Sequence, residues 1–499
     1  MTLSLVCCVT NIKNRLAIGK DNDLLFNLKK DLLFFKNLTT NSLSNESKLN
    51  FNVVLMGRKT YFSIPQKFRP LTNRLNFVLT NDEQFLKMFP IPKNFSCCKR
   101  PIFMTMESFY KIYNKYSPNV FVIGGAKIYN HFLEKKSPSK LYITDVKGYK
   151  GNKEDEYIYM NNFDYRYSLV GYSEEFKDVG FNNEKLTYRT LYYNLTNTKT
   201  DEFKYLDLAK SILNQGNERV DRTGVGTISK FGEQLRFDIS NGTLPLLTTK
   251  RVGLKSVIEE LLFFCRGDTD TSILSDNGVK IWEGNTSREF LDNRGLSTYK
   301  EGIMGNMYGW SWRHFGADYS QRFSDMSKCD RTKIGGFDQL ENVERLLKTD
   351  PFSRRIYISN LNPLETKNMC LDMCHIYIQF YVTEENGEKY LSSYFTMRSS
   401  DYALAAVSFN TMSYALLTYI LALRCNMKPK EIIYNSVDCH IYNTHIKGIK
   451  EQLSRIPRPF PKIKLSNALV NKDWSQMNYS DFDLIGYFPH SSIKMEMAI

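Results

Sequence analysis

Cys374 is the residue whose companions in the sequence best suit it to covalent chemistry. His375 follows it directly, and a set of cationic and polar side chains comes later in the chain: Arg398, Ser399, Asp401, Asn410, His440 and Tyr442. A thiolate attacks electrophilic carbon, while arginine, amide, imidazole and hydroxyl groups hold a phosphate, a base edge and a sugar hydroxyl. The combination therefore indicates covalent chemistry on a nucleotide.

Glu260 is a candidate for proton transfer at the same site. It lies within 256–265, a segment apolar enough to form a buried helix. A carboxylate that faces a core is costly unless it is paired or exchanges protons. We therefore predict that Glu260 moves protons through water.

A second group of candidate residues lies near the start of the chain. Asp31 is the one acid among apolar neighbours where a helix begins, and alone this pattern favours an acid stabilised by the helix dipole. Segments 52–60 and 121–129 each run from a strand through glycine into a helix start, where backbone N–H groups can bind phosphate. Each turn alone is weak evidence, because tight turns also occur for packing reasons.

The first 195 residues alternate short β-rich segments with helix-like ones, which predicts an α/β domain. The predicted strands are Leu3 to Val9, Asn52 to Met56, Asn76 to Thr80, Asn119 to Ile123 and Lys140 to Val146.

The polar composition of residues 196–203 predicts a short linker between two domains, 1–195 and 204–499. The pattern of apolar segments in residues 204–499 predicts an α+β domain. Its expected helices are Tyr205 to Leu213, Ser256 to Cys265 and Ser413 to Arg424, and its expected strands are Arg355 to Ser359 and Ile376 to Val382.

Composition limits the classes of function. A chain of 499 residues is longer than a single hydrophobic core usually supports, so we expect at least two domains. Its content of 42% hydrophobic and 24% charged residues is normal for folded domains. The net charge of +14 is spread without a long basic block, so nucleic acid is an unlikely partner and small anions are favoured.

Ten cysteines without a C-x-x-C pair predict neither a metal site nor a disulfide framework, and they favour a reducing, cytoplasmic location. No run of about 18 apolar residues occurs, so we expect no membrane span.

Taken in order with Arg74 in R-P-L-T-N-R and Thr144 in L-Y-I-T, the motifs of residues 1–195 resemble dihydrofolate reductase. The resemblance implies a central, mostly parallel sheet with flanking helices, and reduction of dihydrofolate with NADPH. Asp31 would bond the pterin and promote protonation of the C=N being reduced, while Arg74 would bind the folate α-carboxylate. The implied folate-binding residues are Asp31, Phe35, Ile64, Arg74 and Thr144. Those implied for NADPH are Ile18, Gly19, Gly57, Arg58, Lys59, Thr60, Gly124, Gly125, Ala126 and Tyr129.

This part of the chain departs from the family in its loop before the acid. Leu25-Phe26 stands where the family usually has Pro-Trp. Phenylalanine keeps an apolar wall but lacks the indole N–H that in the family helps to hold a water near the acid. We therefore expect a slower or more easily perturbed reductase.

Residues 204–499 resemble thymidylate synthase. The motifs include D-R-T-G-V-G-T from Asp221, L-P-L-L-T-T-K ending at Lys250, Cys374-His375, and D-x-H-x-Y ending at Tyr442. The resemblance implies that Cys374 adds to C6 of dUMP, that C5 then attacks 5,10-methylenetetrahydrofolate, and that hydride from the folate completes the methyl group and leaves dihydrofolate. No metal is required.

The same resemblance assigns binding roles. The implied dUMP-binding residues are Arg222, Arg354, Arg355, Arg398, Ser399, Asp401, Asn410, His440 and Tyr442. Asn410 would read the uracil edge, His440 and Tyr442 the ribose 3′-hydroxyl, and Asp401 the folate ring. In the family Arg354 and Arg355 reach the neighbouring subunit's site, which implies a homodimer formed through the synthase domain. The last residues, 497–499, would close over the folate.

Several departures lie close to this chemistry. Asp372-Met373 replaces the family's Pro-Pro or Ala-Pro, and an acid two residues before a thiol raises the thiol pKa when it points inward. The segment 401–410 is one residue longer than in the family, which would displace Asp401 or Asn410.

The leading hypothesis is a bifunctional dihydrofolate reductase–thymidylate synthase, in which one activity releases the substrate of the other. The alternative is a partly inactive relative that keeps nucleotide or RNA binding in a structural or regulatory role. A plain nucleic-acid-binding protein comes third, because no recognised module is present.

Overall fold

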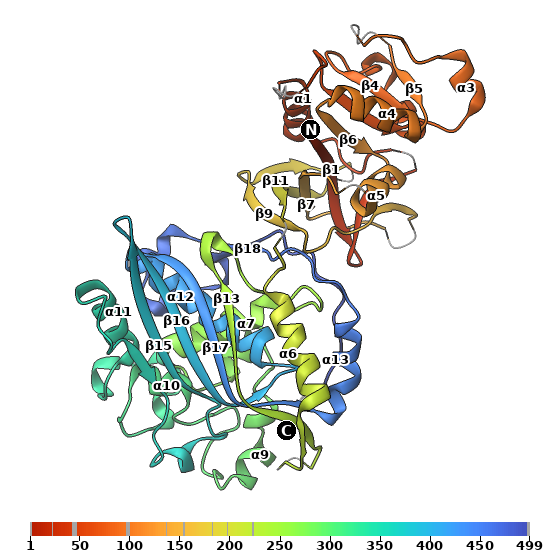
Figure 1. Cartoon of the computed structure of the whole chain (residues 1–499). Coiled ribbons are helices and arrows are strands. Elements are labelled where there is room, and N and C mark those ends of the chain that lie inside the picture. Colours follow the sequence, from red (N-terminus) through yellow and green to blue (C-terminus); the bar gives the residue numbers. More distant parts are fainter. Residues whose placement is uncertain are drawn as a thin grey trace. The chain divides into compact units, whose positions relative to one another are not determined.

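The computed structural model describes residues 2–496 apart from 22, 42–46, 96–99, 136, 153–154, 182, 197 and 222–223. The chain divides into two compact units, Met1–Lys199 and Thr200–Ile499 (Figure 1). Helix α6 (Glu202–Gln215) includes the last two residues of the stretch 196–203 that was predicted as a linker.

The first unit is built on an 11-stranded sheet of order β10-β11-β7-β1-β6-β3-β4-β5, with β2, β8 and β9 joined beside this path. Its strands are β1 (Leu3–Ile12), β2 (Arg15–Lys20), β3 (Val53–Gly57), β4 (Leu75–Leu79), β5 (Ile102–Met104), β6 (Val120–Gly124), β7 (Lys140–Lys147), β8 (Tyr157–Met160), β9 (Tyr167–Tyr172), β10 (Phe176–Val179) and β11 (Lys185–Leu195). Its helices within the described residues are α1 (Lys29–Asn41), α2 (Arg58–Ser63), α3 (Glu83–Met88), α4 (Met106–Tyr116) and α5 (Ala126–Lys135). The strands from β7 to β5 run parallel, which confirms the α/β prediction.

The parallel strands of this unit are apolar because both of their faces are covered. Val53, Val54, Leu55 and Met56 of β3 are all fully buried. Met56 lies opposite Gly124 of β6, so the turns after these two strands meet at the same edge of the sheet. This edge is where ligands bind in open α/β sheets.

The second unit contains a 6-stranded sheet of order β12-β13-β17-β16-β15-β14 and a separate pair, β18 and β19. The strands are β12 (Asn217–Arg219), β13 (Thr227–Asp238), β14 (Tyr357–Ser359), β15 (His375–Glu385), β16 (Glu388–Asp401), β17 (Lys428–Tyr442), β18 (Lys462–Leu465) and β19 (Phe482–Ile485). Beyond α6, the described α-helices are α7 (Leu254–Arg266), α8 (Ser272–Asp276), α9 (Arg288–Asn293), α10 (Tyr308–Arg313), α11 (Gln339–Thr349), α12 (Thr411–Arg424) and α13 (Ile446–Leu453). The α+β prediction is confirmed, and each predicted helix and strand overlaps an observed one.

Shorter helical turns complete both units within the described residues. The 3-10 turns are Gln66–Phe68, Ser240–Gly242, Gly284–Thr286, Gln321–Phe323, Met326–Lys328, Arg331–Lys333, Thr366–Asn368, Asn443–His445, Asn467–Val470, Trp474–Gln476 and Tyr479–Asp481. A π-helical turn, Ala406–Asn410, leads directly into α12.

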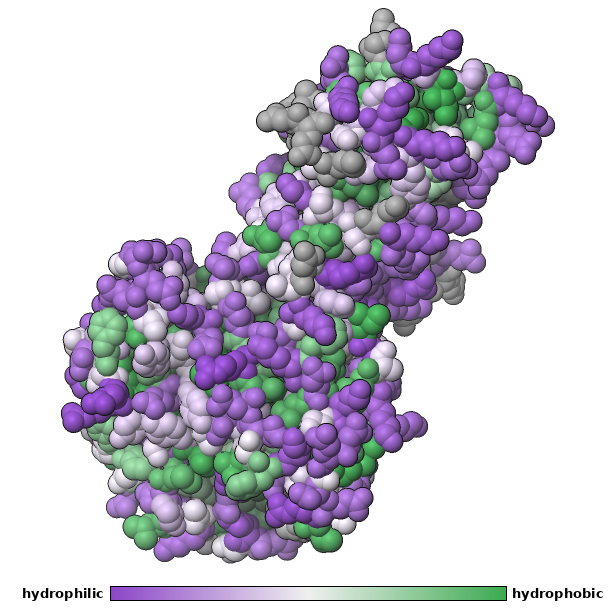
Figure 2. Space-filling model, in the orientation of Figure 1, coloured by the Kyte–Doolittle hydropathy of each residue, from purple (hydrophilic) through white to green (hydrophobic). Residues whose placement is uncertain are grey.

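Helix α12 lies at the centre of the second unit's core, against α7, β16 and β17. Together with the π-turn it forms Ala406–Arg424, the one described helical stretch long and apolar enough to cross a membrane, and 89% of that stretch is buried inside the protein. Its apolar character is therefore explained by the core. The surface seen in Figure 2 is mainly hydrophilic on both units, with smaller hydrophobic patches.

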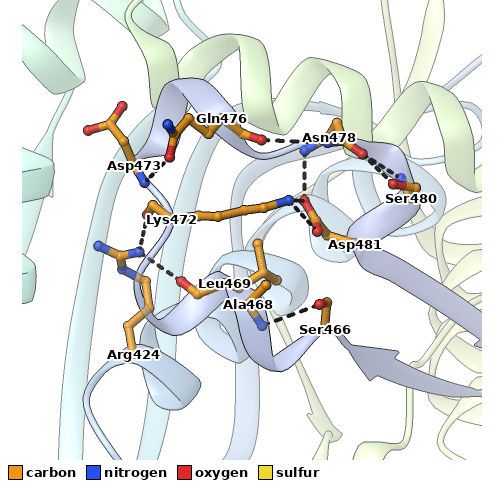
Figure 3. A network of polar contacts seen from close by, with 10 residues as sticks. All are labelled: Arg424, Ser466, Ala468, Leu469, Lys472, Asp473, Gln476, Asn478, Ser480 and Asp481. Carbon is orange, nitrogen blue, oxygen red and sulfur yellow. Dashed lines mark hydrogen bonds and ion pairs between the residues drawn. The ribbon is translucent and has the colours of Figure 1, made fainter.

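The end of α12 is tied to a late segment of the chain by a network of polar contacts (Figure 3). Arg424 donates through Nη1 to the carbonyls of Leu469 at 2.9 Å and Lys472 at 2.6 Å. Lys472 in turn pairs with the Asp481 carboxylate at 2.6 Å. These bonds fix the segment around Lys472 to the end of α12.

Candidate active sites

Asp31 and Thr144 meet at the side of the first unit's sheet, although 113 positions separate them in the chain. Asp31 lies in the first turn of α1, and Thr144 of β7 donates its hydroxyl to Asp31 Oδ1 at 2.5 Å. Burial raises the pKa of Asp31, and the hydrogen bond from Thr144 offsets part of this rise. A buried acid with a raised pKa is suited to giving a proton to a ligand.

Arg74 is a buried cation that forms no ion pair with another described residue. Its exposed fraction is 4%, and it donates to the Thr39 hydroxyl at 2.8 Å and to the Thr72 carbonyl at 3.0 Å. Its guanidinium lies 5.6 Å from the centre of the Phe35 ring, and Phe35 and Ile64 pack on the same core cluster. None of the ion pairs among the described residues includes it, and an unpaired buried charge is costly. A carboxylate of a ligand would supply the missing partner.

The edge formed by β3 and β6 fits a dinucleotide phosphate. The Gly124-Gly125 peptide bond is cis, and Gly124 has a φ of 130°. A Cβ atom on Gly125 would lie 3.0 Å from Thr60 Oγ1, so the backbone of this turn is closely packed on Thr60. Tyr129 donates to the Val6 carbonyl at 2.7 Å and fixes the start of α5.

The remaining predicted cofactor residues lie on α2, β2 and α5. Arg58 and Lys59 begin α2 directly after Gly57, and Arg58 forms an ion pair with Asp82 at the end of the neighbouring strand β4. Ile18 and Gly19 end β2, where a Cβ atom on Gly19 would meet the Asp23 carbonyl at 2.7 Å. Ala126 is the first residue of α5.

Leu25 and Phe26 form the apolar wall expected before the acid. Each is 6% exposed, and both belong to a core cluster with Leu28. The Phe26 ring packs edge-on against Tyr149 at 5.2 Å.

Cys374 begins the turn into β15 and is partly exposed. Its N–H donates to the Tyr308 hydroxyl at 2.9 Å, and its Sγ lies 4.0 Å from the Asp372 carbonyl. Arg398 donates to the carbonyls of Met373 at 3.0 Å and Asp372 at 2.8 Å. The structure therefore places a predicted phosphate-binding cation beside the predicted nucleophile, where positive charge favours the thiolate.

Glu260 is 5% exposed on α7 and accepts a hydrogen bond from Trp282 Nε1 at 2.8 Å. Burial raises the pKa of Glu260 to about 8, with the Trp282 bond acting in the opposite direction. Glu260 also interacts electrostatically with Tyr308, the residue that holds the Cys374 backbone. Burial thus favours the protonated form of Glu260, and Tyr308 interacts with both Glu260 and Cys374.

The segment 401–410 ends in the π-turn. Asn410 donates its N–H to the Ala405 carbonyl at 3.0 Å, five residues back, instead of four. π-turns are rare and often mark functional sites. Asn410 is buried and interacts with the side chain of His375. Burial lowers the pKa of His375 to about 4, which keeps its ring neutral.

Four more predicted residues gather where the parallel strands β16 and β17 end: Ser399, Asp401, His440 and Tyr442. Asp401 pairs with His440 in the strand register, and its Oδ1 accepts from the N–H groups of Ala403 and Leu404, each at 3.1 Å. The rings of His440 and Tyr442 pack edge to face at 5.0 Å.

Arg354 and Arg355 are not among the residues that these contacts bring together. Arg354 and Arg355 are exposed in the turn before β14, and among the described residues no ion pair within the chain includes them. Arg222 and the closing residues 497–499 lie outside the described residues.

Residues that the sequence reasoning missed also contribute to the site. The Tyr308 hydroxyl accepts from the Cys374 N–H, and Trp282 donates to Glu260. The motif Tyr308-Gly was a signal for Tyr308, whereas no sequence pattern indicated Trp282. His445 is fully buried, 3.5 Å from Asp401 Oδ1 and 2.6 Å from the Glu496 carbonyl.

Comparison with known proteins covers both units. Residues 203–499 match the family model for thymidylate synthase, and residues 3–193 match that for dihydrofolate reductase. A protein of Zea mays named bifunctional dihydrofolate reductase-thymidylate synthase is 37% identical, over 97% of this chain and 95% of that protein. The protein of the same name from Paramecium tetraurelia is 37% identical, over 97% of this chain and 96% of that protein. The one from Plasmodium chabaudi is 33% identical, over 96% of this chain and 89% of that protein. The resemblance read from the sequence is confirmed along nearly the whole chain.

Proposed function

The chain belongs to the family of bifunctional dihydrofolate reductase–thymidylate synthases, and on that premise we propose that its two activities use the residues gathered above. It is an enzyme that reduces dihydrofolate with NADPH and converts dUMP to dTMP with 5,10-methylenetetrahydrofolate. The alternative of a partly inactive binding protein is not favoured, because both family models match nearly complete units.

In the reductase unit, Asp31 directs the proton and Arg74 orients the substrate. Thr144 holds the Asp31 carboxyl in place, and the unpaired guanidinium of Arg74 binds the α-carboxylate of folate. NADPH, when bound, supplies the hydride. The turns after β3 and β6 hold its phosphates through backbone N–H groups, with Arg58 and Lys59 beside them.

In the synthase unit, Cys374 adds to C6 of the uracil and is later expelled. Arg398 stabilises the thiolate and the dUMP phosphate, while Asn410 bonds the base edge beside the neutral His375. Glu260 exchanges protons through water. The observation that supports this proposal best is that Arg398 of β16 donates to the carbonyls of Asp372 and Met373, directly before Cys374.

A coupled assay tests both sets of residues together. Purified protein is given dUMP, 5,10-methylenetetrahydrofolate and NADPH, and both dTMP and NADPH oxidation are followed. We expect NADPH to be consumed at the rate at which dTMP appears. NADPH binding without any oxidation would remove the reductase assignments.

Glu260→Gln should lower the synthase rate by about 10²- to 10⁴-fold, the usual contribution of a general acid–base group. Glutamine has the shape of the protonated acid that predominates below pH 8, so the fold should be kept. The wild-type rate should change as pH passes through about 8, and the variant should lose that step.

The neighbouring Glu259, which is only partly buried, provides the matched control. Glu259→Gln should retain the wild-type pH profile of dTMP formation. A Glu260→Gln variant with an unchanged profile would remove Glu260 from proton transfer.

We also propose a homodimer formed through the outer face of the second unit's sheet. On β15, Ile378, Phe380 and Val382 face the core and are at most 4% exposed, whereas the alternating Tyr381 is 67% exposed. Tyr377 shares that outer face and stacks on Tyr357 of β14 at 5.7 Å. An aromatic sheet face open to water is typical of a protein interface.

The position of the two unpaired arginines supports this face. Gln379 of β15 donates to the Arg354 carbonyl at 3.1 Å, so the turn that carries Arg354 and Arg355 is fixed to the edge of the proposed interface. From there their side chains would enter the site of the partner subunit and contact the dUMP phosphate.

Tyr381→Asp should convert the dimer to monomers at micromolar concentration, because a charge on the interface would be buried without a partner. Synthase activity should fall with the dimer, and reductase activity should stay. Sedimentation velocity and the two separate assays check this. Tyr479→Asp, at a 40% exposed tyrosine away from the sheet, is the control. A monomeric variant with full synthase activity would exclude sharing of the site.

The described cysteines are all free thiols, which supports our proposal of a reducing, cytoplasmic compartment.

A further inference from the structure

Asp372 stands two residues before the proposed nucleophile, and its carboxylate is paired with a cation from a distant part of the chain. It forms an ion pair with Arg294, the residue that ends α9. The two side chains are 49% and 37% exposed. The sequence separation of 78 residues hides this pair from any local motif.

Arg294 binds the segment before the nucleophile at three points. Besides the Asp372 carboxylate, Nε donates to the Met369 carbonyl at 3.2 Å and Nη2 to the Thr366 carbonyl at 3.5 Å. A planar guanidinium can make such a set of bonds, whereas a lysine cannot. The segment 366–372 is thereby fixed to the end of α9.

Asp372 transmits this restraint to the reacting groups through its main chain. Its carbonyl accepts from Arg398 Nη2 at 2.8 Å and lies 4.0 Å from Cys374 Sγ. Its carboxylate contacts Arg294, and its carbonyl contacts the nucleophile and a phosphate-binding cation. Asp372 therefore connects Arg294 to Cys374, so a substitution of Arg294 is expected to alter the surroundings of the Cys374 thiol.

The charge of Asp372 makes the pairing necessary. A free carboxylate at this position would favour the protonated thiol and would repel the dianionic phosphate of dUMP. Partial exposure screens such effects, so their size is modest.

We propose that Arg294 is a positioning residue for the synthase reaction, which holds the Asp372 carboxylate away from Cys374 and neutralises its charge. This inference depends on the proposed role of Cys374 as the nucleophile.

The test is the full-length Arg294→Leu variant. The pH dependence of Cys374 alkylation, followed by mass spectrometry of the Cys374 peptide, should move upward by about half to one pH unit. kcat/KM for dUMP at pH 7 should fall by about threefold to tenfold on the same grounds. Arg294→Lys should recover most of the pH shift, because it restores the charge, but only part of kcat/KM, because it loses the three-point contact.

The double variant Arg294→Leu/Asp372→Asn separates charge from shape. Removing the carboxylate should return the alkylation midpoint to the wild-type value even though Arg294 is absent. If the double variant keeps the shifted midpoint, neutralisation of Asp372 is not what Arg294 does. If Arg294→Leu alkylates and turns over like the wild type, the proposal is overturned.

Arg288→Leu is the matched control. Arg288 also lies on α9, pairs with an aspartate of 49% exposure and donates to two main-chain carbonyls, but its partners do not touch Cys374. Its loss should leave the alkylation midpoint unchanged, and a similar shift would mean a general loosening of α9. Failure of wild-type Cys374 to form an adduct with a fluorinated dUMP analogue and the folate would instead refute the proposed function itself.

Discussion

Replacing Cys374 by serine is expected to lower dTMP formation by at least about 10⁴-fold, as loss of a nucleophile does in other covalent enzymes. A serine hydroxyl is far less ionised than a thiol near neutral pH, so it cannot add to the uracil ring at a useful rate. Reduction of dihydrofolate by the same protein should be unchanged, because Asp31 and its neighbours belong to the other unit. The two rates are measured separately on one preparation.

A second cysteine of the same unit provides the control for this variant. Cys329 is partly exposed, like Cys374, but its sulfur contacts only the carbonyls of Arg322 and Asp325 among the described residues. Cys329→Ser should keep both activities. Synthase activity within tenfold of wild type in Cys374→Ser would mean that another group is the nucleophile.

The sequence predicted elements well where a pattern is local. The apolar runs of β3 and β6 and the buried helix α12 were all found, because burial of both faces leaves a strong signal in composition. The polar residue Glu202, which lies within the predicted linker, is the first residue of α6. Its carboxylate is buried and accepts hydrogen bonds from Thr248 and Thr249, contacts that no local pattern encodes.

The contacts that support the proposed site could not be predicted from the sequence. The resemblance gave Cys374 and Arg398, whereas the pairing of Asp372 with Arg294 depends on two segments that meet only in the fold. The sequence also contained no signal for the π-turn before Asn410, because its wider hydrogen-bond ring depends on the packing of the segment and not on a local pattern.

Asp31→Asn is expected to lower the rate of dihydrofolate reduction by about 10²- to 10⁴-fold near neutral pH. Asparagine still fits beside Thr144, but it has no proton to give to the pterin. Burial raises the pKa of Asp31, so its proton is retained to higher pH than in an exposed aspartate. The wild-type rate of hydride transfer should therefore rise as pH falls through that pKa, and the variant should show no such rise.

The pH profile decides between a chemical and a structural role for Asp31. If Asp31 served only to cap α1, asparagine would replace it well and the profile would be unchanged. Glu107→Gln is the control, because Glu107 occupies the first turn of α4 but is 77% exposed and paired with Lys111. Single-turnover measurements of NADPH oxidation on both variants separate hydride transfer from product release. A slow variant whose rate still climbs at low pH would show that solvent delivers the proton without Asp31, and that the acid acts by binding the pterin alone.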